Sequence, residues 1–558
     1  SVPISDSASA RLTGRAGENG ETMHTIVTGR KENGSRFTGI RGQILWEPSD
    51  DFEALVKVEH ATNRMDGGAT VFNNIGGPAC ALCNAVRNSG VDVPEYPSFR
   101  RAAKTINPEY DDTETTSAQL TMNLDVGDWT FTSVSAYGKL DAGVTADYDG
   151  PLTFLESDIT EKSDSIFQEV RAQREIGDGG AFIGGLTYIK TDLRIQQASL
   201  FGAASAGVPL PLNGLSTRVF DQDGESWSPF ASLEVPVGDK IMLSGSLRYS
   251  KEKRTGRARS FNVGVFPPTY LPYDITETRT ENLWDYSLRA RYEFTLSAYV
   301  YLSYATGTKG GGFVSNDALL LTNINNGSAT FQYDSERARS LEIGGKFRFM
   351  DGKGQLNVAL FRTRFSDLQV SEYNGTAFIT GNAASAISQG VEIDTSIGLG
   401  DHWTIGGTLG YLDAHYKDYP GGACLYDAPV TCTPATNNLA GTRLVRAPEW
   451  TASGFVEARY PVSDGLQIVG RASANHQSRS FFQPDMNPLN SQPAFTKFDA
   501  RLALGREDGE WEVAVVGRNL TDKVTISQAF NTPTFGGDSH MALVGAPRTV
   551  TLQLSLDF

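Results

Sequence analysis

Long hydrophobic runs are missing from this chain. Only 39% of its 558 residues are hydrophobic, and no stretch approaches the roughly 18 consecutive apolar residues that cross a membrane as a helix. A helical membrane protein is therefore excluded. A membrane β-barrel is not excluded, because only alternate residues of a barrel strand face the lipid. The length fits either roughly three or four soluble domains or one very large barrel.

An excess of positive charge is also missing. The formal net charge is −16 at pH 7, and an acidic chain repels the phosphates of DNA and RNA. We therefore expect no nucleic-acid partner. The charge says little about the fold itself.

Cysteine is scarce, with four residues in two local pairs. Cys80 lies close to Cys83, and Cys424 lies close to Cys432, both in segments rich in Gly, Asn or Pro. Two loop disulfides formed in an oxidising compartment are the favoured interpretation. The alternative is one zinc site made from both pairs, which requires two distant segments to meet. A haem attachment is excluded, because Asn84 rather than His follows Cys83.

The motifs of common enzymes are missing too. The sequence contains no HExxH metal helix, no GxxxxGK[ST] phosphate loop and no dinucleotide fingerprint. The run TGTKGGGF at Thr306–Phe313 comes nearest to a phosphate loop. It follows a predicted strand and precedes no helix, which favours a flexible exit from the strand. No clustered Ser/His or acidic site of a barrel lipase or protease can be assembled, so we expect neither an enzyme nor a cofactor.

Strict alternation of apolar and polar residues is what the chain does contain. In the last eleven residues, RTVTLQLSLDF, every second residue from Val550 to Phe558 is apolar. One face of an extended strand is then apolar and the other polar. The segments IMLSGSLRYS, from Ile241, and YSLRARYEF, from Tyr286, alternate in the same way. Alone, each segment fits either a half-buried soluble strand or a barrel strand with lipid outside and water inside.

The spacing of these segments favours the barrel. Pairs of them are joined by tight turns rich in Gly and Asp. These turns are EPSDD, DVGD, IGDGG, PVGDK, DGKG, LGDH, PVSDG and REDGE, at 47–51, 125–128, 176–180, 236–240, 351–354, 399–402, 461–465 and 506–510. Successive pairs are separated by long polar stretches at about 61–112, 141–164, 194–226, 251–281, 307–335, 368–386, 417–448, 478–494 and 521–547.

Short turns at one end and long loops at the other are typical of an outer-membrane barrel. We predict an all-β fold over residues 1–558, a large antiparallel transmembrane β-barrel with about 20 strands beginning near Ala8. An even number of strands places both termini on the periplasmic side. All seven Trp residues flank a predicted turn or begin a predicted strand, as expected for aromatic belts at the membrane interfaces.

Two sets of side chains are candidates for contact with a solute. One set consists of charged residues predicted to face the lumen, where they either guide a charged solute or pair into ionic ladders. Its members are Glu169, Arg171, Arg248, Arg289, Arg291 and Arg348. The other set consists of histidines predicted at the extracellular end, which either bind a captured metal complex or are simply solvated. Its members are His60, His415, His476 and His540, with His24 as a weaker candidate.

Several local motifs together resemble the TonB-dependent outer-membrane receptors. Their order and spacing cover almost the whole chain. They are IFQEVRAQ (166–173), FIGGLTY (182–188), SLRYSKEKR (246–254), YLSYATGTKGGGF (301–313), SLEIGGKFRF (340–349), FRTRFSDLQV (361–370), GNAASAISQGVEID (381–394), GRNLTDK (517–523) and PRTVTLQLSLDF (547–558).

The resemblance implies a 22-stranded barrel, closed by a plug, that takes up a scarce solute with energy supplied by TonB. No segment resembles the plug, and Pro3–Leu12 resembles the turn and strand that follow the family's first hairpin. The chain also begins without Met or a signal peptide. We therefore interpret it as the barrel portion, with the plug and about two strands supplied by a longer gene product.

The resemblance also implies the partners. An iron–siderophore complex is the expected small-molecule ligand, with a glycan or another nutrient as the alternative. Outer-membrane lipid and lipopolysaccharide would surround the barrel, TonB would act through the plug, and the barrel assembly machinery would recognise Phe558. A passive pore without a plug and an adhesive surface protein are rival hypotheses.

Overall fold

The computed structural model describes residues 2–557 apart from 68–69, 79, 94–100, 103–109, 153, 178, 203–212, 316, 318, 326, 328–329, 374–377, 430, 464 and 533–538. Helix is confined to short pieces: α1 (Ala81–Arg87), α2 (Leu320–Asn325), η1 (Pro434–Thr436) and η2 (Pro488–Asn490). No helix within these described ranges is long and apolar enough to cross a membrane.

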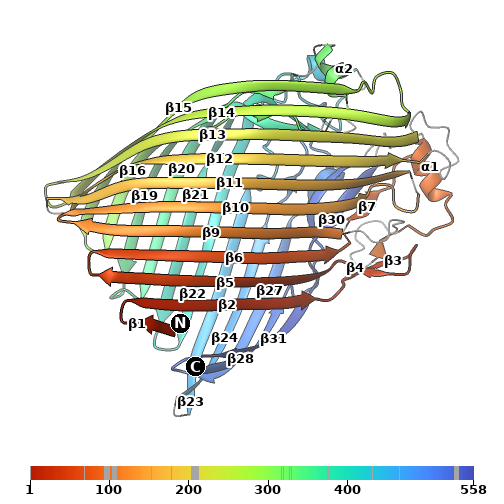
Figure 1. The fold of residues 1–558 in the computed structure, drawn as a ribbon. Helices are drawn as coiled ribbons and strands as arrows, with labels where there is room; N and C mark the ends of the chain where they lie inside the picture. The colour runs from red at the N-terminus through yellow and green to blue at the C-terminus, as the bar shows by residue number, and fades with distance from the viewer. Residues whose placement is uncertain are drawn as a thin grey trace.

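One antiparallel sheet of 21 strands dominates the fold and curves into a barrel (Figure 1). Its strands are β1 (Val2–Ser5), β2 (Ala8–Asn19), β5 (Gly34–Ser49), β6 (Phe52–Asp66), β9 (Tyr110–Val126), β10 (Trp129–Asp147), β11 (Leu155–Ile176), β12 (Gly180–Phe201), β13 (Asn213–Val237), β14 (Ile241–Val265), β15 (Tyr273–Thr295), β16 (Ala298–Lys309), β19 (Glu336–Phe349), β20 (Gly354–Tyr373), β21 (Phe378–Leu399), β22 (Trp403–Asp418), β23 (Trp450–Ser463), β24 (Leu466–Gln477), β27 (Phe495–Arg506), β28 (Trp511–Arg518) and β31 (Thr549–Leu556).

Ten shorter strands lie in the long connections between barrel strands, which all occur at one end of the barrel. They are β3 (Met23–Thr25), β4 (Lys31–Glu32), β7 (Thr70–Asn74), β8 (Arg101–Ala102), β17 (Gly312–Phe313), β18 (Gln332–Tyr333), β25 (Ser480–Phe481), β26 (Ser491–Gln492), β29 (Ile526–Asn531) and β30 (His540–Val544). They form four small sheets of two or three strands each. The prediction of about 20 strands beginning near Ala8 is confirmed, with the four residues of β1 in addition.

One end of the barrel carries only turns of two to four residues, and every turn that the sequence predicts lies there. Two further turns lie at this end. Asp6 and Ser7 join β1 to β2, within the segment Pro3–Leu12 that resembles a turn and strand of the family, and Leu296 and Ser297 join β15 to β16 in a turn that we did not predict. Both ends of the described residues lie near this short-turn end, because the four residues of β1 come directly before the first turn and Leu556 at the end of β31 pairs with Trp511 beside the last turn.

Five predicted loops are wrong in length, because the strands beside them continue well beyond the apolar band. The predicted loop at 251–281, for example, shrinks to 266–272 between β14 and β15. The loops predicted at 61–112, 141–164, 194–226 and 368–386 also begin later or end earlier than expected. A strand of 25 residues such as β14 spans about 80 Å, whereas the apolar band of such barrels is about 25 Å tall. Beyond the band polar residues and glycine occupy both faces over stretches such as 251–257 of β14, so the alternation that marks a strand is interrupted.

The outward face of the barrel is apolar and exposed. Leu288, Leu502 and Leu552 are 61%, 61% and 74% exposed, values that a soluble protein avoids for a continuous apolar surface. Outward aromatic pairs such as Trp284 with Tyr249, whose ring centroids are 4.7 Å apart, lie toward the long connections. Trp129 and Phe182, 6.1 Å apart, lie toward the short turns. A transmembrane β-barrel with two aromatic belts accounts for this surface.

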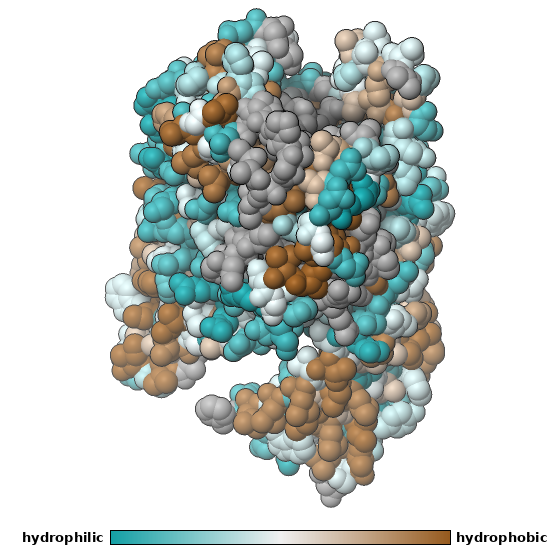
Figure 2. Space-filling view, turned by 90° about the vertical axis from the view of Figure 1, so that its right-hand side faces the viewer, coloured by the Kyte–Doolittle hydropathy of each residue, from teal (hydrophilic) through white to brown (hydrophobic). Residues whose placement is uncertain are grey.

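The sheet has two edges among its described residues. β1 pairs only with β2, and β31 pairs only with β28. Figure 2, which views the long-connection end, shows a hydrophilic rim and, below it, a break in the wall between two hydrophobic surfaces. Val550, Leu552, Leu554 and Leu556 on β31 all face outward, as the alternation in RTVTLQLSLDF predicts. Phe558 lies outside the described residues.

The assignment of β15 residues to the lipid-facing and lumen-facing surfaces can be tested directly. Leu288→Arg places a charge in the lipid and is expected to cost about 2 to 4 kcal/mol if the site lies near the bilayer midplane. Ser287→Arg is the matched control, because Ser287 is the next residue on β15 and faces inward, where its hydroxyl lies 2.7 Å from that of Ser246. Chemical unfolding in lipid vesicles measures both free energies. Equal losses from the two variants would contradict the assignment of faces.

Candidate functional site

The inward face of the barrel is lined by ion pairs. In β23, β24, β27 and β28, the charged side chains form a network across neighbouring strands. Glu457 lies 2.9 Å from Arg459 and 3.3 Å from Arg471, and Arg501 pairs with Glu512. These residues alternate with exposed outward residues such as Val456 and Leu502. The wall of the lumen is therefore polar and largely neutralised.

The six charged residues predicted to face the lumen all alternate with outward apolar residues. Glu169 and Arg171 pair with each other at 2.7 Å, and Arg291 pairs with Glu293 at 2.8 Å. Arg289 lies 4.4 Å above the ring of Tyr301.

The other two differ in their surroundings. Arg248 donates to the Ser250 hydroxyl at 3.4 Å, and Arg348 lies beside the turn at Leu296 and Ser297. Half of the set therefore follows the ionic-ladder interpretation, and no two members of different strands meet at one site.

The glycine run at 310–312 is held against the lumen wall. The Gly311 amide donates to Glu281 at 2.9 Å, and the Gly311 carbonyl accepts from Arg254 at 2.5 Å. The Arg279 guanidinium donates to the Tyr333 carbonyl at 2.6 Å. The run leaves a strand as predicted, since β16 ends at Lys309, but its backbone is hydrogen-bonded to the wall. The run is glycine because a side chain at Gly311 would overlap Arg279 and the Tyr333 carbonyl.

The connection that follows this run folds back into the barrel. Phe313, Leu320 and Phe331 pack on Phe220 and Tyr273, which are inward residues of β13 and β15. A second apolar cluster holds α1, whose Val86 is fully buried with Phe154 and Phe201. The long connections thus build an apolar core over the mouth.

Both cysteine pairs lie in these connections. Cys80 is bonded to Cys83 with Cα atoms 5.2 Å apart, and Cys424 is bonded to Cys432 with Cα atoms 6.1 Å apart. The first disulfide lies at the start of α1 and is buried in its apolar cluster. Since the two pairs are separate bonds, the structure does not assemble the alternative zinc site. No group of three or more metal-ligating side chains occurs in the part of the chain that the structure describes.

The four principal candidate histidines are not brought together. His60, His415 and His476 have the same strand parity as exposed outward residues, and each is held on its own strand or the next, by Thr116 at 3.0 Å, Asp413 at 3.0 Å and Thr496 at 2.9 Å. They therefore face away from the lumen.

The other two candidates, His540 and His24, do not form a site either. His540 is 1% exposed and bonds Asn490 and Asn487 at 2.8 and 3.3 Å. His24 is exposed in the small sheet of β3, β4 and β8. The hypothesis of a histidine site for a metal complex is not supported by these positions.

A hollow of about 480 Å³ at the mouth is the best candidate for contact with a solute. It lies between β20, β22 and the connections 419–449 and 478–494. The guanidinium of Arg446 lies 5.2 Å above the ring of Phe482, and Gln369, Gln483 and Gln528 line the same hollow. A cation, an aromatic face and amides together suit an anionic, partly aromatic solute. Sequence reasoning missed this set, because its members come from four distant segments without a motif.

The carboxyl of Asp149 gives the mouth a pH-dependent element. Asp149 is buried in the connection between β10 and β11, and its carboxyl accepts hydrogen bonds from the backbone amides of Phe154 and Leu155. Burial raises the pKa of this carboxyl well above its usual value, and the charge of Asp147 raises that pKa further.

This raised pKa fixes the direction of a pH effect. The folded state holds the proton more tightly than the unfolded state, so the stabilisation is complete below about pH 4 and is lost as the pH rises through the folded pKa. Hydrogen exchange at Phe154 and Leu155 should accelerate over this range beyond its intrinsic pH dependence. The excess acceleration should vanish in Asp149→Asn, and its persistence there would rule out Asp149 as the cause.

The glycine run gives a second test. Gly311→Ala should displace the run and destabilise the connection by about 1 to 3 kcal/mol, as overpacking typically does. Gly307→Ala is the matched control, because a side chain there meets nothing within 4 Å. Exchange of the Val314 amide, which donates to Phe331 at 2.9 Å, measures the effect. Unchanged exchange in Gly311→Ala would show that the run is not tightly held.

Comparison with known proteins identifies the family. Residues 60–520 match the family model described as TonB dependent receptor-like, beta-barrel. The probable TonB-dependent receptor BfrD of Bordetella pertussis is 24% identical over 352 residues, which is 62% of this chain and 40% of that protein. The probable TonB-dependent siderophore receptor PiuA of Acinetobacter baumannii is 25% identical over 341 residues, which is 61% of this chain and 41% of that protein. The match thus spans about two-fifths of the length of these curated relatives.

The solved structures agree in fold. The ferric yersiniabactin uptake receptor FyuA of Yersinia pestis superposes with a TM-score of 0.77 at 18% identity, covering 100% of this chain and 76% of that chain. At that identity the likeness concerns the fold alone. The family match, by contrast, extends over most of the chain and over most of the barrel strands, from within β6 to β28. The protein therefore belongs to the TonB-dependent receptor β-barrel family, a family of outer-membrane receptors.

Proposed function

We propose that this protein is an outer-membrane transport receptor that captures an iron–siderophore complex and takes it up with energy supplied through TonB. The observation that carries the proposal is the hollow at the mouth, where Arg446 lies over Phe482 above a polar lumen. An anionic ferric complex with aromatic ligands matches both groups. Family membership and the siderophore receptors among its relatives support the same substrate class.

The proposal includes a plug in the lumen. Residues 1–558 would form the barrel domain, and a plug would close the lumen and carry the contact with TonB. Two observations support this. The edges at β1 and β31 remain unpaired within the described residues, although unpaired backbone groups in lipid are costly. The chain also covers only 76% of the FyuA receptor structure. The intact mass of the polypeptide isolated from outer membranes tests this part.

The orientation follows from the same reasoning. The long-connection end would face the medium, and the short turns and both termini would face the periplasm. The barrel assembly machinery would insert the chain, and outer-membrane lipid would cover the apolar band. Labelling of a cysteine placed at Leu296, a fully exposed turn residue, distinguishes the two sides in intact cells. Labelling from outside the cell would contradict the orientation.

Uptake tests the function itself. Cells whose chromosomal gene for this receptor is deleted and which produce the receptor from a plasmid should accumulate a labelled ferric siderophore from a panel. The accumulation should disappear in a strain without TonB. Binding that persists without uptake in the strain that lacks TonB separates capture from transport. A large, steady conductance of the intact protein without ligand would instead indicate a passive pore. A panel of glycans tests the alternative substrate class.

Arg446→Ala tests the mouth hollow. Loss of the cation should weaken binding of the anionic complex about tenfold, equivalent to about 1.4 kcal/mol, because the Phe482 ring and the amides remain. Arg36→Ala is the control, since Arg36 lies on the outward face and pairs with Glu18 at 3.6 Å. Binding to receptor-containing membranes gives both dissociation constants. Equal affinities would place the solute elsewhere.

A further inference from the structure

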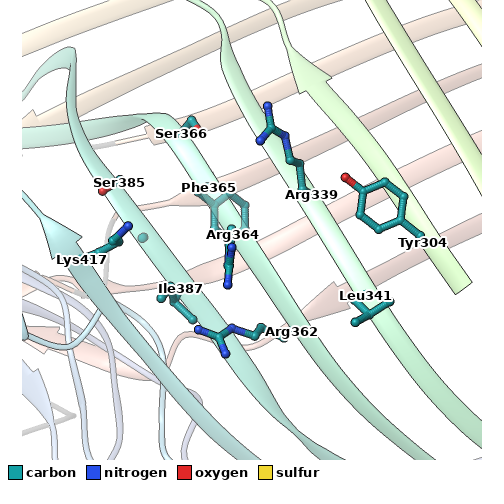
Figure 3. Close-up of a pocket in the computed structure, with 11 residues that line it drawn as sticks. Tyr304, Arg339, Leu341, Arg362, Arg364, Phe365, Ser366, Ser385, Ile387 and Lys417 are labelled. Carbon is teal, nitrogen blue, oxygen red and sulfur yellow. The ribbon is translucent and has the colours of Figure 1, made fainter.

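A group of basic side chains lies on the outward face of β19 to β22, away from the lumen. Arg339, Arg362, Arg364 and Lys417 line a hollow of about 530 Å³ together with Tyr304 and Ile387 (Figure 3). Arg339 has the strand parity of Leu341, and both Arg362 and Arg364 have that of Leu360, residues that are 51% and 48% exposed on the outer surface. In Figure 3 the opposite wall of the barrel lies behind these strands.

The register places like charges against each other. Arg339 on β19 is directly opposite Arg364 on β20, and Leu341 is opposite Arg362. Like charges that face each other across two strands destabilise a sheet. Within the described residues, none of the four cations forms an ion pair or a side-chain hydrogen bond. Asp413, on the same outward face of β22, is already engaged by Gln389 at 2.8 Å and by His415 at 3.0 Å.

The opposite wall of the barrel has a matched arrangement that is neutralised. Arg36 on β5 lies directly opposite Arg64 on β6, and both face outward. There, however, Glu18 lies 3.6 Å from Arg36 and Asp112 lies 3.6 Å from Arg64. In the basic hollow the corresponding neighbours are Thr306 and Ile387. The same strand geometry therefore carries its own counter-ions at one site and lacks them at the other.

The height of the hollow on the wall points to the ligand. Arg339 lies ten residues before Phe349, where β19 ends at a short turn. For strands tilted by about 40° this is about 25 Å along the barrel axis, which is the far edge of the apolar band. Tyr304, whose ring lies 6.1 Å from that of Tyr286, marks the aromatic belt there. Arg339 and Arg364, which is opposite it, thus lie just above the acyl chains, at the depth of lipid headgroups. Arg362, opposite Leu341, lies about 5 Å lower, from where its long side chain can reach the headgroups.

We propose that this hollow binds the phosphorylated headgroup of the outer-leaflet glycolipid, lipopolysaccharide. Arg339 and Arg364 would share one phosphate, since guanidinium groups bind phosphate in a bidentate fashion. Arg362 and Lys417 would contact a second anionic group, and the apolar Leu341 and Ile387 would lie beside an acyl chain. The assignment of the leaflet rests on the orientation in the proposed function. The solute site at the mouth is separate, because the two hollows share no lining residue.

The matched arginine pairs provide the test. The variants R339Q/R364Q and R36Q/R64Q are purified as full chains from outer membranes, and the glycolipid retained per barrel is measured by native mass spectrometry. Retention should fall at least tenfold in R339Q/R364Q and remain near wild type in R36Q/R64Q. In nanodiscs, wild type should bind diphosphorylated lipid A, bind dephosphorylated lipid A at least tenfold more weakly, and lose no lipid to millimolar inorganic phosphate.

Three results would overturn the proposal. They are equal retention in the two double variants, equal binding of the dephosphorylated lipid, and complete displacement by inorganic phosphate, which would indicate a free-anion site. The single variant R364Q guards against misfolding. In detergent without glycolipid it should be at least as stable as wild type, because it removes the facing charge. Loss of siderophore uptake in R446A is scored separately, so failure of the transport proposal leaves this test intact.

Discussion

Backbone hydrogen bonding in lipid is the constraint on which the structure depends. Inside the bilayer no water can pair with an amide or a carbonyl, so each strand must bond to its neighbours along its full length. The 21-strand antiparallel ladder meets this demand between its two edges. Once the ladder is fixed, side chains alternate between lipid and lumen, except at bulges such as the one between Phe365 and Leu368 on β20. Every assignment of a residue to one of the two surfaces follows from that alternation.

The two surfaces solve different electrostatic problems. On the lumen side, water and neighbouring strands let charges pair, as Glu457 does with Arg459 and Arg471. On the outward side the apolar band excludes charge, and charged side chains return only above the aromatic belt. There, Arg36 and Arg64 have carboxylate partners, whereas Arg339 and Arg364 have none among the described residues. The acidic net charge of the whole chain conceals this local basic surface.

Much of the barrel could be predicted from the sequence because alternation and Gly/Asp turns are local signals. The turn at Leu296 and Ser297 escaped because it contains neither Gly nor Asp. The upper halves of β13 and β14 escaped because polar residues and glycine occupy both faces at 221–226 and 251–257, which interrupts the alternation. The outward position of His60 was a missed inference, since it has the same parity as Val56 and Val58 in FEALVKVEH. The hollow at Arg446 could not be predicted, because it depends on how separate connections fold over one another.

The small sheet of β29, β30 and β7 has a consequence for the order of assembly. It pairs Val71 and Phe72, in the connection between β6 and β9, with Ala542 and Met541, in the connection between β28 and β31. These two connections flank opposite edges of the ladder, so pairing them before the strands between them have formed would mean closing a very long unstructured loop. The entropy of closing so long a loop must already have been offset by the barrel. Competence to hold a solute at the mouth is therefore the last property that the folding chain acquires, and it reports that the wall beneath it is in register.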